Sequence, residues 1–95
     1  MIKNIEYFEK YQHTIEIFLC NKTSFKIRMT LSQLFEMISD NSFIYAHKGA
    51  VVNMKYIEKI ISDDIFLRSG KIIPISRRNH KTIKENFSKY VGEVL

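Results

Sequence analysis

Hydrophobic and polar residues alternate along the first third of the chain, as they do in strands that bury one face. The run 13–20 alternates in this way, and the run 25–29 repeats the pattern after the polar stretch 21–24. Two alternating runs separated by a short polar stretch predict a β-hairpin. The mostly apolar stretch 2–8 precedes the hairpin and is predicted as a further strand.

At Thr30 the spacing of the hydrophobic residues changes from alternation to every third or fourth residue. This change predicts a short helix over residues 31–38. Thr30 can cap the helix, and Gln33 three residues later completes the pattern of a capping box. Leu31, Leu34 and Ile38 then fall on one face of the predicted helix, which gives it an amphipathic character.

The second half of the chain returns to β-branched and aromatic residues. The run 43–54 predicts strands that the polar group 47–49 interrupts, and the apolar positions at 57, 60 and 61 lead to an expected turn at 63–64. Residues 65–67 and 71–75 predict a second hairpin around 68–70. Pro74 has no amide donor, so we expect it on an edge strand or near a strand end.

The last stretch of the chain predicts a helix that begins near Ser76. Apolar residues within 83–91 recur at helical spacing, and Arg77, Lys81 and Lys84 share a neighbouring face. Taken together, these patterns predict a single domain over residues 1–95, mainly β, with a short internal helix and a C-terminal helix.

Positive charge is concentrated in the second half of the chain. The formal net charge is +5, and residues 1–47 are balanced, so residues 48–95 carry the whole excess. A one-sided basic surface suits a polyanion, because neutralised phosphates release condensed counterions. The same charges are also compatible with an ordinary solvated surface.

Enzyme and metal chemistry find little support in the sequence. The three histidines, at 13, 47 and 80, are too far apart to form a close ligand pair, and three glycines do not make a phosphate-binding loop. We therefore expect no enzyme activity, no metal and no cofactor. Cys20 is alone in an apolar stretch, so we interpret it as a core thiol in a reducing compartment. The sequence lacks a membrane span or signal peptide, and we expect a cytoplasmic protein.

The most informative segment is 43–53, which reads Phe-Ile-Tyr-Ala-His-Lys-Gly-Ala-Val-Val-Asn and is followed by Tyr56-Ile57. Residues 73–78, Ile-Pro-Ile-Ser-Arg-Arg, follow about twenty residues later. Together with 5–9 and the helix start at 30–31, these motifs resemble the LytTR family of bacterial DNA-binding domains. The resemblance extends from about Ile5 to about Ile83.

The resemblance implies elongated antiparallel β sheets whose loops enter successive grooves of promoter repeats, often with two molecules on one site. It implies double-stranded DNA as the partner and transcription regulation in a two-component system as the function. His13 matches a position that reaches a major groove, Lys48 a loop along the backbone or minor groove, and Arg78 a base-reading arginine. The family also implies a receiver domain in a longer response regulator. The chain is then an excised fragment or a version shortened at its N-terminus.

Side-chain chemistry agrees with these assignments. Arginine can bind guanine through two parallel hydrogen bonds, whereas lysine suits phosphates. The predicted DNA-binding residues are His13, Lys48, Arg77, Arg78, Asn79 and Lys81. Arg77 and Arg78 oppose the dipole at a helix start, so an anionic partner explains them better than helix stability does.

Several alternatives stay open. His13 has an alternative role as a polar residue at a strand start, while His47 and Asn53 are interpreted as loop residues that bond the backbone. The family has Arg-Ser where this chain has Lys48-Gly49. That departure favours a second hypothesis, a protein-interaction module of the same fold without specific DNA binding. A third is an RNA-binding β domain, in which exposed aromatic rings stack on bases.

Overall fold

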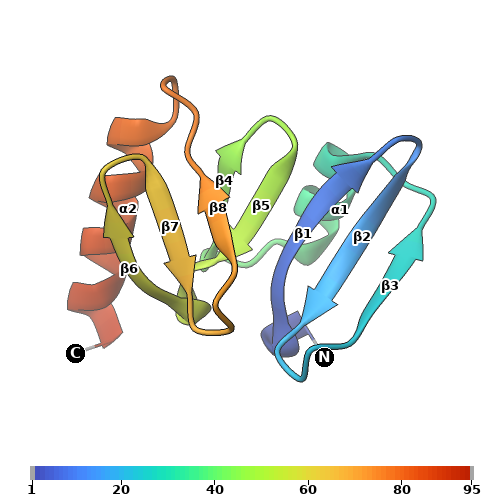
Figure 1. The fold of residues 1–95 in the computed structure, drawn as a ribbon, viewed down its shortest axis with the longest axis horizontal. Helices are drawn as coiled ribbons and strands as arrows, with labels where there is room; N and C mark the ends of the chain where they lie inside the picture. The colour runs from blue at the N-terminus through green and yellow to red at the C-terminus, as the bar shows by residue number, and fades with distance from the viewer. Residues whose placement is uncertain (1, 95) are drawn as a thin grey trace.

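Two antiparallel sheets lie side by side along the long axis of the molecule (Figure 1). The computed structural model describes residues 2–94 of the domain expected over residues 1–95, with extents of 34 × 27 × 25 Å. The larger sheet contains β1 (Ile5–Tyr11), β2 (Thr14–Leu19), β3 (Ser24–Ile27), β4 (Phe43–His47) and β5 (Ala50–Asn53). Its strand order is β3-β2-β1-β5-β4. The structure therefore confirms a mainly β fold.

The smaller sheet contains β6 (Ile57–Ile61), β7 (Asp64–Leu67) and β8 (Ile72–Pro74) in that order. The helices are α1 (Leu31–Ile38) and α2 (His80–Val94), and short 3-10 turns occupy Ile2–Asn4 and Met54–Tyr56. Pro74 ends the outer strand β8, as its missing amide donor predicts.

One face of the five-stranded sheet packs against α1. Leu31, Leu34 and Ile38 of the helix join Phe8 and Val51 of the sheet in one buried cluster. The capping box is present as predicted, since the Gln33 backbone N–H donates to the Thr30 hydroxyl and the Thr30 N–H donates to the Gln33 side chain. The helix predicted over 31–38 is thus confirmed at both ends.

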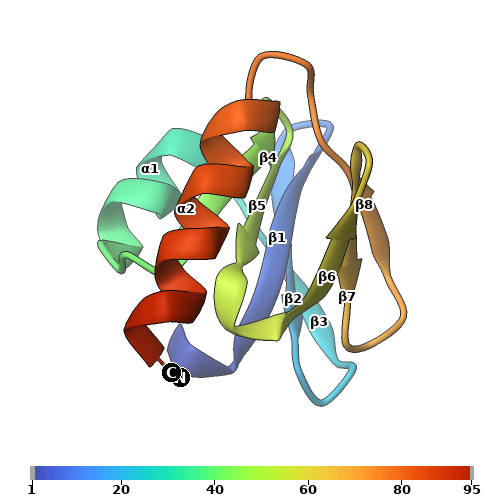
Figure 2. The same cartoon turned by 90° about the vertical axis from the view of Figure 1, so that its left-hand side faces the viewer.

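The opposite face of the five-stranded sheet packs against the smaller sheet and α2. The second buried cluster joins Tyr7 and Val52 of the larger sheet to Ile65 and Ile73 of the smaller one, and Ile83 of α2 completes it. Figure 2 shows α1 and the three-stranded sheet on opposite sides of the five-stranded sheet. Both sheets are therefore held in one packed unit.

Several expected boundaries are wrong by a few residues. The strand predicted over 2–8 begins only at Ile5 and continues to Tyr11, because the chain first makes a 3-10 turn. Residues 57–61, which carried no predicted element, form β6, and Asp64, expected in a turn, begins β7. The C-terminal helix begins at His80 rather than near Ser76.

Candidate nucleic-acid interface

Three loops that carry most of the predicted DNA-binding residues lie along one edge of the molecule. They are the β1–β2 turn (12–13), the β4–β5 turn (48–49) and the β8–α2 connection (75–79). In Figure 1 these loops occupy the upper edge, and the chain termini lie at the opposite edge. We call the set of three loops the loop edge. Segments far apart in the sequence thus lie at the same edge of the molecule.

The β1–β2 turn presents His13 to solvent. Tyr11 pairs with Thr14 across the turn, and the Thr14 hydroxyl donates to the Tyr11 carbonyl at 2.9 Å. Gln12 adopts a φ of 56°, a left-handed conformation that tightens the reversal. His13 is exposed, as a residue that reaches toward a groove must be.

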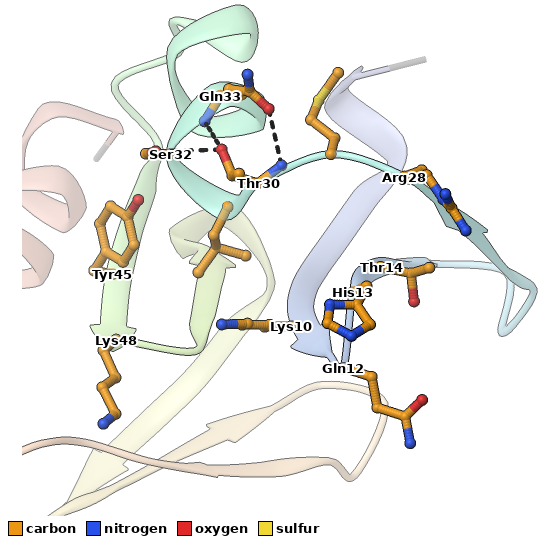
Figure 3. A pocket seen from close by; sticks show the side chains of 12 residues that line it. Lys10, Gln12, His13, Thr14, Arg28, Thr30, Ser32, Gln33, Tyr45 and Lys48 are labelled. Atoms are coloured by element: carbon orange, nitrogen blue, oxygen red, sulfur yellow. Dashed lines mark hydrogen bonds between the residues drawn. The ribbon is translucent and has the colours of Figure 1, made fainter.

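The β4–β5 turn presents Lys48. The backbone N–H of Gly49 donates to Nδ1 of His47 at 3.1 Å, so His47 stabilises its own turn and the predicted structural role is confirmed. Lys48 is exposed, and in Figure 3 its side chain extends away from the β strands that carry the turn. A flexible cation in this position is available to a phosphate.

The β8–α2 connection presents Arg77 and Arg78, both of which are exposed. Ser76 does not cap α2; its hydroxyl and carbonyl accept the Asn79 N–H at 3.3 and 3.0 Å and close a turn before the helix. Arg77 therefore belongs to this turn, and the predicted sharing of a helix face with Lys81 is wrong. Half-buried Asn79 donates from its amide to the Tyr45 carbonyl at 3.4 Å and ties the loop to β4.

The first turn of α2 carries Lys81 beside a fixed histidine. Lys81 is 89% exposed and lies 3.9 Å from Glu85, so this surface pair is weak and leaves the ammonium available. His80 Nε2 lies 2.7 Å from Asp63 and 3.0 Å from the Ser62 carbonyl. Because both neighbours accept, Nε2 must carry a proton, and His80 fastens the helix start to the β6–β7 turn.

Backbone hydrogen bonds connect the three loops to one another. The Lys10 N–H donates to the Gly49 carbonyl at 2.8 Å, which joins the end of β1 to the β4–β5 turn. The Ser76 N–H donates to the Ala46 carbonyl at 2.9 Å, which joins the β8–α2 connection to β4. These two bonds therefore tie the neighbouring segments of the loop edge to one another.

An open pocket of about 540 Å³ lies between the β1–β2 turn, the β4–β5 turn and the start of α1 (Figure 3). Lys10, His13, Arg28 and Lys48 line it, together with the ring of Tyr45. Lys10 and Arg28 were not among the predicted residues. Lys10 lies beyond the strand predicted over 2–8, so no position relative to the loops could be predicted for it.

The interpretation of Cys20 as a core residue is wrong. β2 ends at Leu19, so Cys20 lies in the following turn and is exposed. The other expected structural residue, Asn53, is 1% exposed and bonds backbone groups: it donates to the Ile5 carbonyl and accepts from the Lys55 N–H. Its predicted role as a loop-bonding residue is confirmed.

Two general properties of the described residues complete the picture. Within residues 2–94, no three His, Cys, Asp or Glu side chains gather in a way that could hold a metal ion. Neither helix in that range has the length and apolar composition needed to cross a bilayer.

Comparison with known proteins agrees with this geometry. A family model described as the LytTr DNA-binding domain matches residues 1–88. A similar solved structure is the LytTr DNA-binding domain of a Bacillus cereus protein described as a methyl-accepting/DNA response regulator. It is 17% identical and has a TM-score of 0.81, over 90% of this chain and 82% of that one. A comparison with curated protein sequences gave no match. The family match covers nearly the whole chain, and the chain therefore belongs to the LytTr DNA-binding domain family.

Proposed function

We propose that this domain binds duplex DNA in a sequence-specific manner and regulates transcription, with its loops inserted into successive grooves. The observation that carries the proposal is that His13, Lys48 and Arg78, from three distant segments, all belong to the loops of the loop edge and are exposed. Scattered surface charges would not converge in this way. Basic side chains gathered at one edge can face the phosphates that border a groove.

We propose different roles for the individual residues. Arg78 reads a base edge, because its planar guanidinium can bind the two acceptors of guanine. His13 reaches a neighbouring groove, and Lys48 and Lys81 bind phosphates that fix the register. Arg77 lies next to Arg78 in the same turn and adds charge to that contact, whereas Asn79 holds the turn in place and is available to DNA only through its remaining amide atoms.

We also propose that two molecules occupy one target on repeated half-sites, and that the domain is the output module of a response regulator with a receiver domain. Both proposals rest on the family. The first can be tested directly, because the stoichiometry of a complex on a duplex with one or two half-sites is measurable by analytical ultracentrifugation. A single molecule on the complete site would contradict it.

The primary test is selection of preferred duplexes from a random pool, followed by affinity measurements at two salt concentrations. We expect an enriched motif and an affinity for it at least 10³ times that for random duplex, as is typical of specific binders. Binding without an enriched motif would show that the domain contacts duplexes only as polyanions, and it would contradict sequence-specific recognition. No binding to duplexes would favour the protein-interaction alternative.

The division of roles predicts opposite signatures for two variants. Arg78→Ala should weaken binding to the selected duplex by about 1–3 kcal/mol and relax the preference at one base pair. Lys48→Ala should weaken binding to all duplexes alike and lower the salt slope by about one. Lys89→Ala, an exposed charge in the distal half of α2, is the matched control. Equal losses on specific and random duplexes for both variants would contradict the assignment.

A further inference from the structure

The pocket beside His13 has a basic wall that the proposed groove contacts do not use. Lys10 and Arg28 are exposed side chains on this wall, and neither forms an ion pair within residues 2–94. In Figure 3 Lys10 extends from β1 across the gap toward the β4–β5 turn, whereas Arg28 lies on the far side of His13. The two cations thus flank a residue already proposed to approach DNA.

The positive charge of the pocket is not neutralised by carboxylates. No Asp or Glu is among the described residues that line it. The neighbouring Glu9 lies opposite Glu16 in the register of β1 against β2. Because side chains alternate along β1, Glu9 is on the opposite face of the sheet from Lys10. Like charges gathered around a pocket repel one another, so an anion in the pocket would be favoured.

The rest of the pocket lining is partly apolar and partly polar, the polar part being Gln12, Thr14, Thr30, Ser32 and Gln33. In the apolar part, Tyr45 and Met29 are half-buried and Leu31 is buried. A ligand with an anionic group and an apolar body would match a basic rim above such a wall. A deoxyribose with its attached phosphate has both parts, and the volume of about 540 Å³ is large enough to hold that unit.

We propose that this pocket binds one sugar–phosphate unit of the duplex backbone, with Lys10 and Arg28 as its phosphate ligands. The inference rests on the proposed function and deepens it. It assigns to the loop edge a backbone contact through Lys10 and Arg28, next to the contact proposed for Lys48. The backbone bond from Lys10 to Gly49 fixes the pocket relative to the β4–β5 turn. The bound phosphate would therefore set the register of both neighbouring loops on DNA.

The first experiment replaces single phosphates of the selected duplex by neutral methylphosphonates and measures binding of the wild-type chain and of Lys10→Gln. Lys10→Gln should lower the affinity roughly five-fold at 0.15 M salt and reduce the salt slope by about one. One linkage should weaken wild-type binding most, weaken Lys10→Gln and Arg28→Gln less, and leave the double variant with both substitutions unaffected.

Lys89→Gln is the matched control, because it removes the same charge from an exposed helical site outside the pocket. We expect its affinity to respond to every methylphosphonate as the wild type does. If Lys10→Gln also responds as the wild type does at every linkage, the local contact is absent and the proposal is wrong. Unchanged thermal stability of Lys10→Gln would show that the fold is intact.

A second experiment does not depend on duplex binding. Thymidine 3′,5′-bisphosphate is titrated into the labelled chain, with thymidine as the uncharged comparison, and amide shifts are followed by NMR. The bisphosphate should shift the amides around Lys10, His13 and Arg28; Lys10→Gln should reduce those shifts, and the double variant with Arg28→Gln should abolish them. No shift at these amides would overturn the pocket assignment. Shifts in a chain that binds no duplex would leave the pocket standing as a site for free nucleotides and reject the proposed function.

Discussion

Asn53 is a buried polar side chain that determines where β5 ends. Its amide donates to the Ile5 carbonyl at 2.9 Å, and its carbonyl oxygen accepts the Lys55 N–H at 3.0 Å. The first bond crosses from β5 to the start of β1, and the second begins the 3-10 turn that leads to β6. One side chain therefore connects the larger sheet to the path toward the smaller one.

Replacement of Asn53 by alanine should lower the free energy of unfolding by about 1–3 kcal/mol, because it leaves buried backbone groups without partners. Asn41→Ala is the control, since Asn41 is exposed in the turn before β4. Urea denaturation followed by circular dichroism measures both variants. Similar midpoints for Asn53→Ala and the wild type would show that the two hydrogen bonds do not hold the strand end.

The site could be predicted in part at the level of residues. His47 and Asn53 were interpretable because short polar side chains beside turns commonly bond the local backbone. The position of Lys10 beside the β4–β5 turn could not be predicted, because it depends on the Lys10–Gly49 backbone bond between segments far apart in the sequence. Cys20 was misplaced because its apolar neighbours do not reveal that β2 stops one residue earlier.

At the scale of elements, the register of β1 against β2 shifts between Ile5 and Tyr7, and Tyr7 lies directly after this irregularity. The ring of Tyr7 stacks on Phe18 with centroids 4.3 Å apart and belongs to the cluster that reaches the smaller sheet. Burial, followed by the nearby carboxylates Glu9, Glu6 and Glu16, raises the pKa of Tyr7 above its ordinary value. The folded chain therefore favours the neutral phenol.

This shift predicts a loss of stability in alkali. The unfolded chain releases the Tyr7 proton near the ordinary pKa of about 10, whereas the folded chain retains it to higher pH. The contribution is complete below pH 10 and is lost as the pH rises above it. Tyr7→Phe keeps the stacked ring, so its free energy of unfolding should fall less steeply above pH 10. Parallel pH profiles for the two chains would contradict this explanation.

A bulge also explains why β6 escaped sequence analysis. The register of β6 against β7 shifts between Ile57 and Lys59, so buried Ile57 and half-buried Ile60 are three residues apart rather than two. In so short a run, this irregularity removes the alternation of buried and exposed residues that would predict a strand. The regular hairpins and the capping box of α1 have no such irregularity, which is why they could be predicted from the sequence alone.

At the scale of the whole molecule, two hydrophobic clusters lie on opposite faces of one sheet. Leu34 of α1 belongs to one cluster and Ile83 of α2 to the other, and β1 and β5 contribute residues to both. Because these central strands cannot separate without exposing both clusters, the domain should unfold as one cooperative unit.

Leu34→Ala and Ile83→Ala should each lower the free energy of unfolding by about 2–5 kcal/mol, the usual range for such core truncations. Both should shift the midpoint of the same single transition. Thr82→Ala, at an exposed position next to Ile83, should stay within about 0.5 kcal/mol of the wild type. Two separated transitions in either core variant, by circular dichroism or by amide exchange, would show that the clusters unfold independently.

The backbone bonds from Lys10 to Gly49 and from Ser76 to Ala46 have a consequence for mismatched targets. In the proposed complex, loops tied together in this way could not follow a duplex in which the segments they contact have been moved apart. One inserted base pair advances the far segment by about 3.4 Å and rotates it by about 34°. A point change in the target would thus cost a single contact, whereas an insertion or deletion between the contacted segments would disengage one loop entirely.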